Sequence, residues 1–527
     1  MQTSKILFRI GTFILAATLI AGCTKESRKA RLLGEANGYF KAGDYDKAKL
    51  SYLNALQLDP QNALAFERIG AMWQDDGAPL RAAGFLKRAS ELDPKNVQNR
   101  IRLARCYVAT GHFADGTKEA LKVLEQAPDN GDAIITLTEA ARSKEDIEAA
   151  EEQLQKFPKK NDVSFYLAAA NLSFSGGDLS TAINALQQAL AADPKSSAAH
   201  MAMGNLHLVQ KDLKQVGEEF KKAADLAPVR SIERLKYAEF EWGVGDAGEV
   251  RRIATDMTRS APDYLPGWFW LAELAYKDKK YDEALSLLEN VFGRDDEYLD
   301  GRRLQGDLLL AKGDTKKALE VLERLDQTYP DVPIIKYNLA RAYLQNNNTN
   351  QAKLALDQAV SLNPNYDDAV LLLAEVNLST GHGEAVIEPL TRLLRRRPDL
   401  RNAALVLAGA YDSLERFDDA AVVLEEQAKL APNDPQPLIA LGMTYRQAKR
   451  NDEARQAFEK AAQLSPNNLS PVSQLVELEV LDKHFDAARQ LIQRQFQKTP
   501  NLPASHFFEG RILVGEGKWD AAEAELQ

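Results

Sequence analysis

The side chains that could bind a metal ion or act as nucleophiles are few and scattered. The chain of 527 residues has six histidines and two cysteines. His200 and His207 have a spacing that places both on one face of a helix, where they could bind a metal ion. No third ligand lies near them in the sequence, and Leu438 and Tyr445 hold the same two helical positions in a later segment. We therefore interpret this pair as half-buried packing residues and predict no metal site.

The sequence also lacks the motifs of common catalytic centres. No glycine-rich phosphate loop follows a predicted strand, and no nucleophile elbow or metal-spaced Cys/His cluster is present. Cys106 lies between the predicted core positions Leu103 and Tyr107, so it is expected to be a small packed residue. The net charge of −10 provides no basic surface for nucleic acid. We predict a non-catalytic protein without a cofactor, whose partners are other proteins.

The elements that position these residues recur every 34 residues. In the segment 436–466, Leu438, Leu441, Gly442 and Tyr445 have the spacing of one helix face, and a second apolar helix follows the polar turn. A proline closes the segment. Such a helical hairpin cannot bury both apolar faces alone, so it needs a copy on either side. The prolines mark the copies: Pro60, Pro94, Pro128, Pro194, Pro228, Pro262, Pro330, Pro364, Pro398, Pro432, Pro466 and Pro500.

A 34-residue unit of two helices resembles the tetratricopeptide repeat. That family has a small residue on the first helix, which lets the two helices approach closely, and an alanine on the second. The small residue recurs as Ala36, Gly70, Ala104, Ala170, Gly204, Ala238, Ala272, Gly306, Ala340, Ala374, Ala408, Gly442 and Gly510. The resemblance covers nearly all of residues 29–527. It implies an all-α fold, a right-handed superhelical solenoid of antiparallel helix pairs.

The repeat register divides the chain. Repeats 1–3 occupy residues 29–130, a shortened repeat 4 occupies 131–162, repeats 5–14 occupy 163–502, and an incomplete repeat 15 occupies 503–527. Because Pro128 and Pro158 are closer together than a full repeat, we expect a local change of twist at repeat 4. That change could separate repeats 1–3 from repeats 5–14. The sequence stops within a second helix and shows no polar capping helix, so we expect that it continues beyond Gln527 in the natural protein.

The first 23 residues differ from the repeats. Lys5 and Arg9 precede an apolar core at 10–21, which is shorter than the roughly 20 residues that span a bilayer. The sequence LIAGC at 19–23 resembles a bacterial lipobox. This resemblance implies a signal peptide at 1–22 and a lipidated leader at 23–28, with Cys23 carrying acyl chains that anchor the protein to a membrane. By resemblance to enterobacterial sorting, Thr24 favours the outer membrane, with the protein facing the periplasm. An ordinary signal peptide is the alternative.

In the tetratricopeptide repeat family the first helix of each repeat lines a concave groove. At the position just after the small residue, repeats 7–9 carry acids, and aromatic residues lie close by. We predict that this groove binds an extended, basic segment of a partner protein. The alternative is that the acids form a solvated ridge and most of the aromatic residues belong to the core. The predicted partner-binding residues are Glu239, Trp242, Phe269, Glu273, Tyr276 and Asp307.

Together these features favour a membrane-anchored scaffold for protein–protein interaction. The sequence resembles the tetratricopeptide lipoproteins that accompany exopolysaccharide export, exosortase sorting or outer-membrane assembly systems. One alternative is a non-catalytic arm of an enzyme, such as a glycosyltransferase, whose catalytic domain lies beyond residue 527. Another is a cytoplasmic repeat array whose N-terminus merely resembles a signal.

Overall fold

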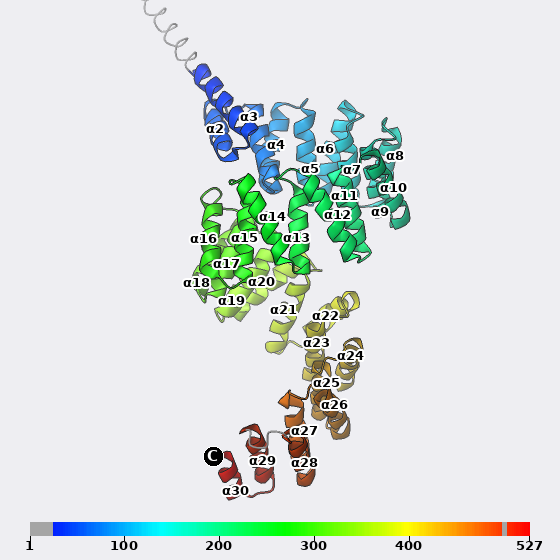
Figure 1. Ribbon diagram of the computed structural model, residues 1–527, viewed down its shortest axis with the longest axis vertical. Helices are drawn as coiled ribbons and strands as arrows, with labels where there is room; N and C mark the ends of the chain where they lie inside the picture. Colours follow the sequence, from blue (N-terminus) through cyan, green and yellow to red (C-terminus); the bar gives the residue numbers. More distant parts are fainter. Residues whose placement is uncertain (1–24, 498–502) are drawn as a thin grey trace, which may run out of the picture. The chain divides into compact units, whose positions relative to one another are not determined.

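The computed structural model describes residues 25–497 and 503–527 (Figure 1). The predicted signal peptide at 1–22 and the predicted lipidation site Cys23 lie outside these ranges. Within them every regular element is a helix, and the helices pair along the chain, so the prediction of an all-α solenoid is confirmed. Residues 25–28, which we assigned to a leader, are helical and continuous with the first helix, which ends at residue 42.

The chain forms two compact units, Met1–Leu304 (unit 1) and Gln305–Gln527 (unit 2). The boundary falls inside α17 (Leu299–Ala311). This boundary does not coincide with repeat 4, where we expected a division between repeats 1–3 and repeats 5–14.

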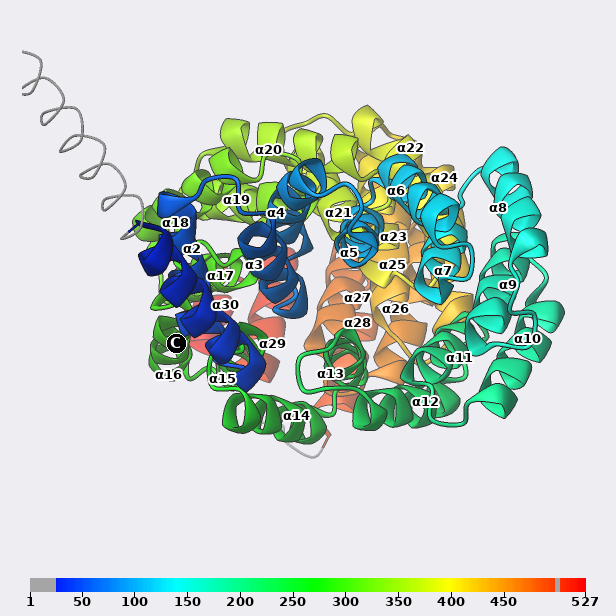
Figure 2. The same cartoon turned by 90° about the horizontal axis from the view of Figure 1, so that it is seen from above.

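The helices of unit 1 follow the predicted register. They are α2 (Tyr45–Leu58), α3 (Ala63–Asp75), α4 (Pro79–Leu92), α5 (Val97–Ala109), α6 (Phe113–Gln126), α7 (Gly131–Ala140), α8 (Lys144–Lys156), α9 (Val163–Ser175), α10 (Leu179–Ala192), α11 (Ser197–Val209), α12 (Leu213–Leu226), α13 (Ile232–Val244), α14 (Ala247–Ser260), α15 (Leu265–Lys277) and α16 (Tyr281–Phe292). Figure 2 shows α9, α11, α13 and α15 on the inner side of this curved array, with α10, α12, α14 and α16 outside them.

After α17, the helices of unit 2 again alternate along the chain between first and second helices of a repeat. They are α18 (Thr315–Thr328), α19 (Pro333–Gln345), α20 (Thr349–Leu362), α21 (Asp367–Ser379), α22 (Glu384–Arg396), α23 (Arg401–Ser413), α24 (Phe417–Leu430), α25 (Gln436–Gln447), α26 (Asn451–Leu464), α27 (Leu469–Leu481), α28 (Phe485–Gln495), α29 (Pro503–Gly515) and α30 (Trp519–Leu526).

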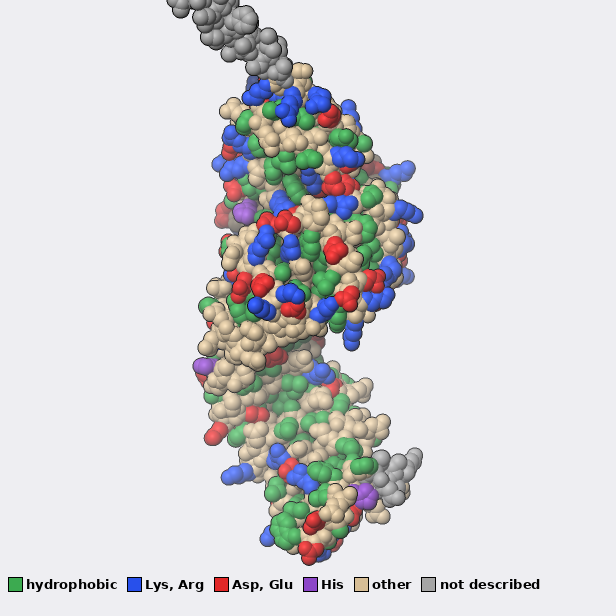
Figure 3. All heavy atoms as spheres, turned by 90° about the vertical axis from the view of Figure 1, so that its left-hand side faces the viewer, with side chains coloured by type: hydrophobic (Ala, Val, Ile, Leu, Met, Phe, Trp, Pro, Cys, Tyr) green, Lys and Arg blue, Asp and Glu red, His purple; other side chains and the backbone are tan. Residues whose placement is uncertain are grey.

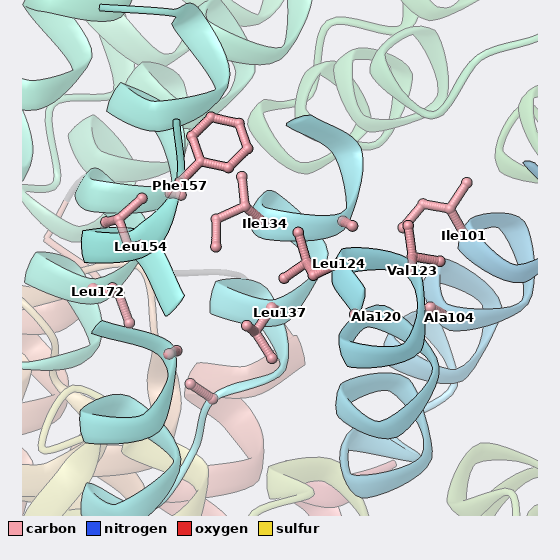
Figure 4. Packing of buried hydrophobic residues seen from close by; sticks show 14 residues of the cluster. Ile101, Ala104, Ala120, Val123, Leu124, Ile134, Leu137, Leu154, Phe157 and Leu172 are labelled. Atoms are coloured by element: carbon pink, nitrogen blue, oxygen red, sulfur yellow. The ribbon is translucent and has the colours of Figure 1, made fainter. Parts of the chain in front are cut away.

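The shortened repeat 4 keeps an unbroken core. Residues 141–143 join α7 to α8, where Ser143 and Asp146 form a capping box. Apolar side chains from α5 to α9 meet in one buried cluster (Figure 4). Because this cluster runs through repeat 4 without a gap, the array continues across it. The cluster includes Ile101, Val123, Leu124, Ile134, Leu137, Leu154, Phe157 and Leu172.

The predicted small residue lets paired helices touch. A Cβ atom added to Gly442 on α25 would lie 2.5 Å from a ring carbon of Phe458 on α26. Phe458 is fully buried. Gly204 meets Phe220 in the same way, with an added Cβ 2.4 Å from the ring. A larger side chain in either place would have to displace a buried aromatic ring.

Side-chain caps mark the helix starts. Asn62 and Asn96 each accept a hydrogen bond from the backbone N–H three residues on, at 3.0 Å. Asp44 caps α2 by accepting from the backbone of Lys47. Asp314 holds the equivalent place before α18 but does not cap it: α18 has no side-chain cap hydrogen bond, and Asp314 pairs with the Lys317 ammonium at 2.7 Å.

Candidate protein interface

The residues that could have bound a metal ion are engaged in other contacts. His200 on α11 is buried, with Nδ1 2.6 Å from the Glu219 carboxylate and Nε2 3.2 Å from the Pro194 carbonyl oxygen. His207 faces Gln210, with its Nδ1 3.1 Å from the side-chain oxygen. Across the described residues, no group of three or more His, Cys, Asp or Glu side chains is arranged to hold a metal ion.

Cys106 on α5 is a packed residue, as predicted. Its side chain is fully buried. Burial raises the pKa of its thiol to about 12, so the reactive thiolate is disfavoured.

A row of side chains, partly exposed and partly buried, follows the first helices of repeats 5–8. The row lies on α9, α11, α13 and α15, which form the inner wall of unit 1 (Figure 2). Each helix contributes a polar or acidic residue and, three positions later, a large apolar or aromatic one. We call this set the inner strip: Asn171, Phe174, Asn205, Leu208, Glu239, Trp242, Glu273 and Tyr276.

The apolar members of the inner strip are accessible to solvent. Phe174 is 43% exposed and Leu208 is 46% exposed, whereas Trp242 and Tyr276 are half-buried. Sequence analysis missed Phe174 and Leu208. The signal was available, because both share the register of Trp242 and Tyr276 at intervals of one repeat. Large exposed apolar side chains in a row are typical of a protein-binding surface.

The aromatic residues predicted for the site divide between core and surface. Phe269 is buried and contacts Trp270 and Tyr298, with ring centroids 5.7 and 6.2 Å away. The half-buried Trp242 ring lies 5.8 Å from that of Trp270, and the Lys277 ammonium sits 4.6 Å from its centroid. Phe269 therefore supports the inner strip from behind, while Trp242 reaches the surface with a cation beside it.

The three acids predicted for the site differ in their surroundings. Glu239 is the most exposed and accepts from the Lys236 ammonium at 2.6 Å. Glu273 is buried and pairs with the Arg303 guanidinium at 2.6 Å. In unit 2, Asp307 is buried and pairs with Arg341 at 2.5 Å. The last two carboxylates therefore hold arginines of this chain.

Arg303 and Asp300, on α17, are two neighbours of this site that sequence analysis missed. Arg303 holds Glu273 and lies 6.0 Å from the Phe269 ring centroid. Asp300 lies in the first turn of the same helix and is exposed to solvent. This end of the inner strip thus carries the carboxylates of Asp300, Glu239 and Glu273. The opposing charges are those of Arg303, Lys236 and Lys277.

On the face that Figure 3 shows, Lys and Arg side chains are interspersed with Asp and Glu. Within the part of the chain that the structure describes, no helix is long and apolar enough to cross a membrane.

Family models match along the chain. Models described as tetratricopeptide repeat match residues 31–62, 74–118, 174–236, 259–333, 309–361 and 337–400. The model described as "Psidin, N-terminal TPR repeats region" matches residues 376–504. The chain belongs to the tetratricopeptide repeat family. Its repeats support a role in protein–protein interaction, since such arrays present extended binding surfaces.

Curated relatives share only part of their length with this repeat protein. It is 30% identical over 115 residues to serine/threonine-protein phosphatase 5 of Rattus norvegicus, covering 22% of this chain and 23% of the phosphatase. It is 22% identical over 187 residues to anaphase-promoting complex subunit 7 of Dictyostelium discoideum, covering 35% of this chain and 32% of that subunit. The chain thus spans less than a third of either relative.

Two solved structures are similar to parts of this chain. The crystal structure of the APC/C hetero-tetramer Cut9-Hcn1 is 14% identical, with a TM-score of 0.43, and the alignment covers 86% of this chain and 96% of the matched one. A MamA double mutant is 20% identical, with a TM-score of 0.30, and the alignment covers 32% of this chain and 93% of the matched one.

Proposed function

We propose that this protein is a non-catalytic scaffold of the bacterial cell envelope, held on a membrane by a lipid anchor, and that the inner strip binds an extended segment of a partner protein. The observation that carries the binding role is the row of exposed Phe174 on α9 and Leu208 on α11, continued by the half-buried Trp242 on α13. Asn171, Asn205 and Glu239 flank this row. Apolar side chains provide binding area, and the amides and carboxylate beside them can fix the position and direction of a peptide.

The end of the inner strip near Glu239 suits a basic residue of the partner. Glu239 is exposed, and Asp300 and Glu273 lie near it, with Arg303 and Lys236 as the opposing charges. The partner segment that fits best has apolar residues along most of its length and a Lys or Arg at the position that meets Glu239. This narrows the earlier prediction, because Glu273 and Asp307 already pair with arginines of the chain.

A peptide selection tests the binding role. A library of unstructured peptides displayed on phage is selected against the full chain, and selected peptides are synthesised and their dissociation constants measured. Trp242→Ala and Phe174→Ala should each weaken binding at least about tenfold, and Glu239→Lys should weaken only peptides with a basic residue. Trp519→Ala is the matched control, because Trp519 is 66% exposed but lies on α30, outside the strip. Equal affinities for Trp242→Ala and Trp519→Ala would contradict the proposal.

The membrane anchor rests on the sequence at 10–23. An acyl chain contributes about 0.8 kcal/mol per buried methylene, so two or more chains on Cys23 would hold the protein durably. The test is incorporation of radiolabelled palmitate in a bacterial host, followed by membrane fractionation. We expect label and membrane association in the parent protein and loss of both in Cys23→Ser. Cys106→Ser is the control, since Cys106 is buried within a helix.

A further inference from the structure

Unit 1 closes on itself through contacts between its first two repeats and its last three. The turns at the starts of α2 and α4 lie against the loops that follow α12, α14 and α16 (Figures 1 and 2). These segments are far apart in sequence: Arg230 and Asp76, which form one of the contacts, are separated by 154 residues. We call this set of contacts the rim contact.

Arg230 is the centre of the rim contact. Its guanidinium donates to the Asp76 carboxylate at 2.8 Å, to the Gly43 carbonyl oxygen at 3.1 Å, and to Asp263. The same guanidinium lies 4.2 Å from the centroid of the Tyr45 ring. Asp263 also accepts from the Tyr45 backbone N–H at 2.8 Å. One arginine from the loop after α12 therefore connects the turns of repeats 1 and 2 with the loop after α14.

Two further ion pairs lie at the same rim. Arg81 on α4 is 2.5 Å from the carboxylate of Asp295, and Arg294 is 2.9 Å from that of Asp46. The contacts that cross the rim are thus mainly between charged groups. Neighbouring repeats, in contrast, are joined by apolar clusters, such as the one around Tyr52 and Ile69 in repeats 1 and 2. An ion pair can break and re-form while the apolar clusters between neighbouring repeats stay packed. Because Asp76 and Asp295 are buried, salt screens their pairs only weakly, and removal of a cation is the effective way to open the contact.

We propose that the rim contact is a reversible clasp, which keeps unit 1 closed and whose opening admits a partner to the inner strip. The role of the clasp in access rests on the proposed function of the strip. Closure itself does not, since it follows from the charged contacts at the rim. Helix α13, which begins two residues after Arg230, carries Glu239 and Trp242 of the inner strip. A clasp residue therefore lies in the loop that leads directly into a helix of the binding surface.

Distance measurement on the full chain tests closure without any partner. Nitroxide labels are placed at Leu50→Cys and Ile232→Cys in a Cys23→Ser background, because both positions are exposed and neither side chain takes part in the rim contact. Double electron–electron resonance should give one narrow distribution in the parent. Arg230→Met and Arg81→Met should each add a population at longer distance, because each removes a cation from a buried carboxylate of the rim contact. Circular dichroism confirms that the variants keep their helices.

The matched control is Arg251→Met. Arg251 pairs with Asp278 of the next repeat at 3.2 Å and does not cross the rim, so it should leave the distribution unchanged. An unchanged distribution in both Arg230→Met and Arg81→Met would overturn the clasp, as would an equal effect of Arg251→Met. The role in access is measured separately, as the association rate of a strip-binding peptide. This rate should rise at least about threefold in Arg230→Met, and an unchanged rate overturns gating while leaving strip binding intact.

Discussion

The guanidinium of Arg230 donates a hydrogen bond to the carboxylate of Asp76, which is 1% exposed, at 2.8 Å. Burial raises the pKa of Asp76, while Lys49 and Arg230 lower it. The carboxylate therefore depends on its two cations to remain charged in a buried place. Both cations must therefore lie beside Asp76 in the folded state, because loss of either one leaves a buried charge that is only partly compensated.

Tyr264, which lies beside this pair, gives a prediction with an unusual sign. Its hydroxyl is buried and has no hydrogen-bond partner among the described residues. Tyr264→Phe removes that unsatisfied group and keeps the ring, so the free energy of unfolding should stay equal or rise by up to about 1 kcal/mol. Tyr45→Phe is the contrast. The Tyr45 hydroxyl donates to Asp75 at 3.0 Å, and its loss should lower the free energy of unfolding by about 1 kcal/mol. Urea unfolding measures both, and equal losses would contradict the prediction.

Close packing of paired helices predicts a local effect at Gly442. In Gly442→Ala the new Cβ would lie 2.5 Å from the buried ring of Phe458, and Gly442→Leu would crowd it further. We expect each substitution to lower the free energy of unfolding by about 1–3 kcal/mol. Since each repeat contacts mainly its neighbours, hydrogen exchange should rise first in repeats 12–14.

Gly38→Ala is the control for this packing effect. Gly38 lies in the first helix, and an added Cβ has nothing within 4 Å. The substitution should stabilise the protein by about 0.5–1 kcal/mol through the reduced entropy of the unfolded chain. A uniform rise in exchange across all repeats in Gly442→Ala would mean that the array does not respond locally.

Sequence periodicity was sufficient to predict the fold, because each repeat depends on local spacing. The small residue and the closing proline each act within one helix pair, and the structure confirms them. The turn between paired helices is less regular in sequence: Gly43 takes a φ of +77°, but Lys449 takes +60° at the equivalent place. Since lysine rarely adopts a positive φ, the presence of Lys449 in the sequence does not predict this conformation.

Long-range contacts could not be predicted in the same way. The periodicity shows which repeats are neighbours, but it does not fix how far the array curves. Contacts such as Arg230 with Asp76 depend on that curvature. The site shows the same limit. The exposure of Trp242 and Glu239 follows from their helical positions, whereas the pairing of Glu273 with Arg303 depends on the rotation between successive repeats.

Glu249 on α14 predicts a loss of stability in acid. Hydrogen bonds from Arg252 and Tyr237 together lower its pKa from 4.5 to about 2, against the effect of burial. A carboxyl group whose pKa is lower in the folded than in the unfolded state stabilises the fold when the pH is above its pKa in the unfolded chain. This contribution is lost as the pH falls from 4.5 towards 2. Because Arg252 is half exposed, solvent screening limits the effect to about 1 kcal/mol. Glu249→Gln should flatten the dependence of unfolding free energy on pH in this window. Glu148→Gln is the control: Glu148 forms an exposed pair with Lys144, so this substitution should leave the pH dependence of the unfolding free energy unchanged.

Asp412 on α23 predicts the opposite dependence. Its side chain is half-buried, Oδ2 accepts from the Thr444 hydroxyl at 2.9 Å, and Oδ1 is buried with no hydrogen-bond partner in the described part of the chain. Burial raises its pKa above 3.8, while the hydrogen bond from Thr444 lowers it. The folded state therefore holds this proton more tightly than the unfolded state, so its contribution to stability falls as the pH rises through the folded pKa.

Asp412→Asn should remove this cost, since an amide oxygen still accepts from Thr444 and carries no charge. We expect the variant to be more stable than the parent at pH 7, by less than about 1 kcal/mol because half of the side chain is solvated. Below pH 3.8, where the carboxyl group is protonated in both states, the difference should disappear. Asp418→Asn is the control, because Asp418 is 94% exposed and its pair with Arg450 is expected to contribute little. The measured quantity is the free energy of unfolding of Asp412→Asn minus that of the parent. If this difference were lower at pH 7 than at pH 3, the buried carboxylate would be stabilising the fold, and the assigned sign would be wrong.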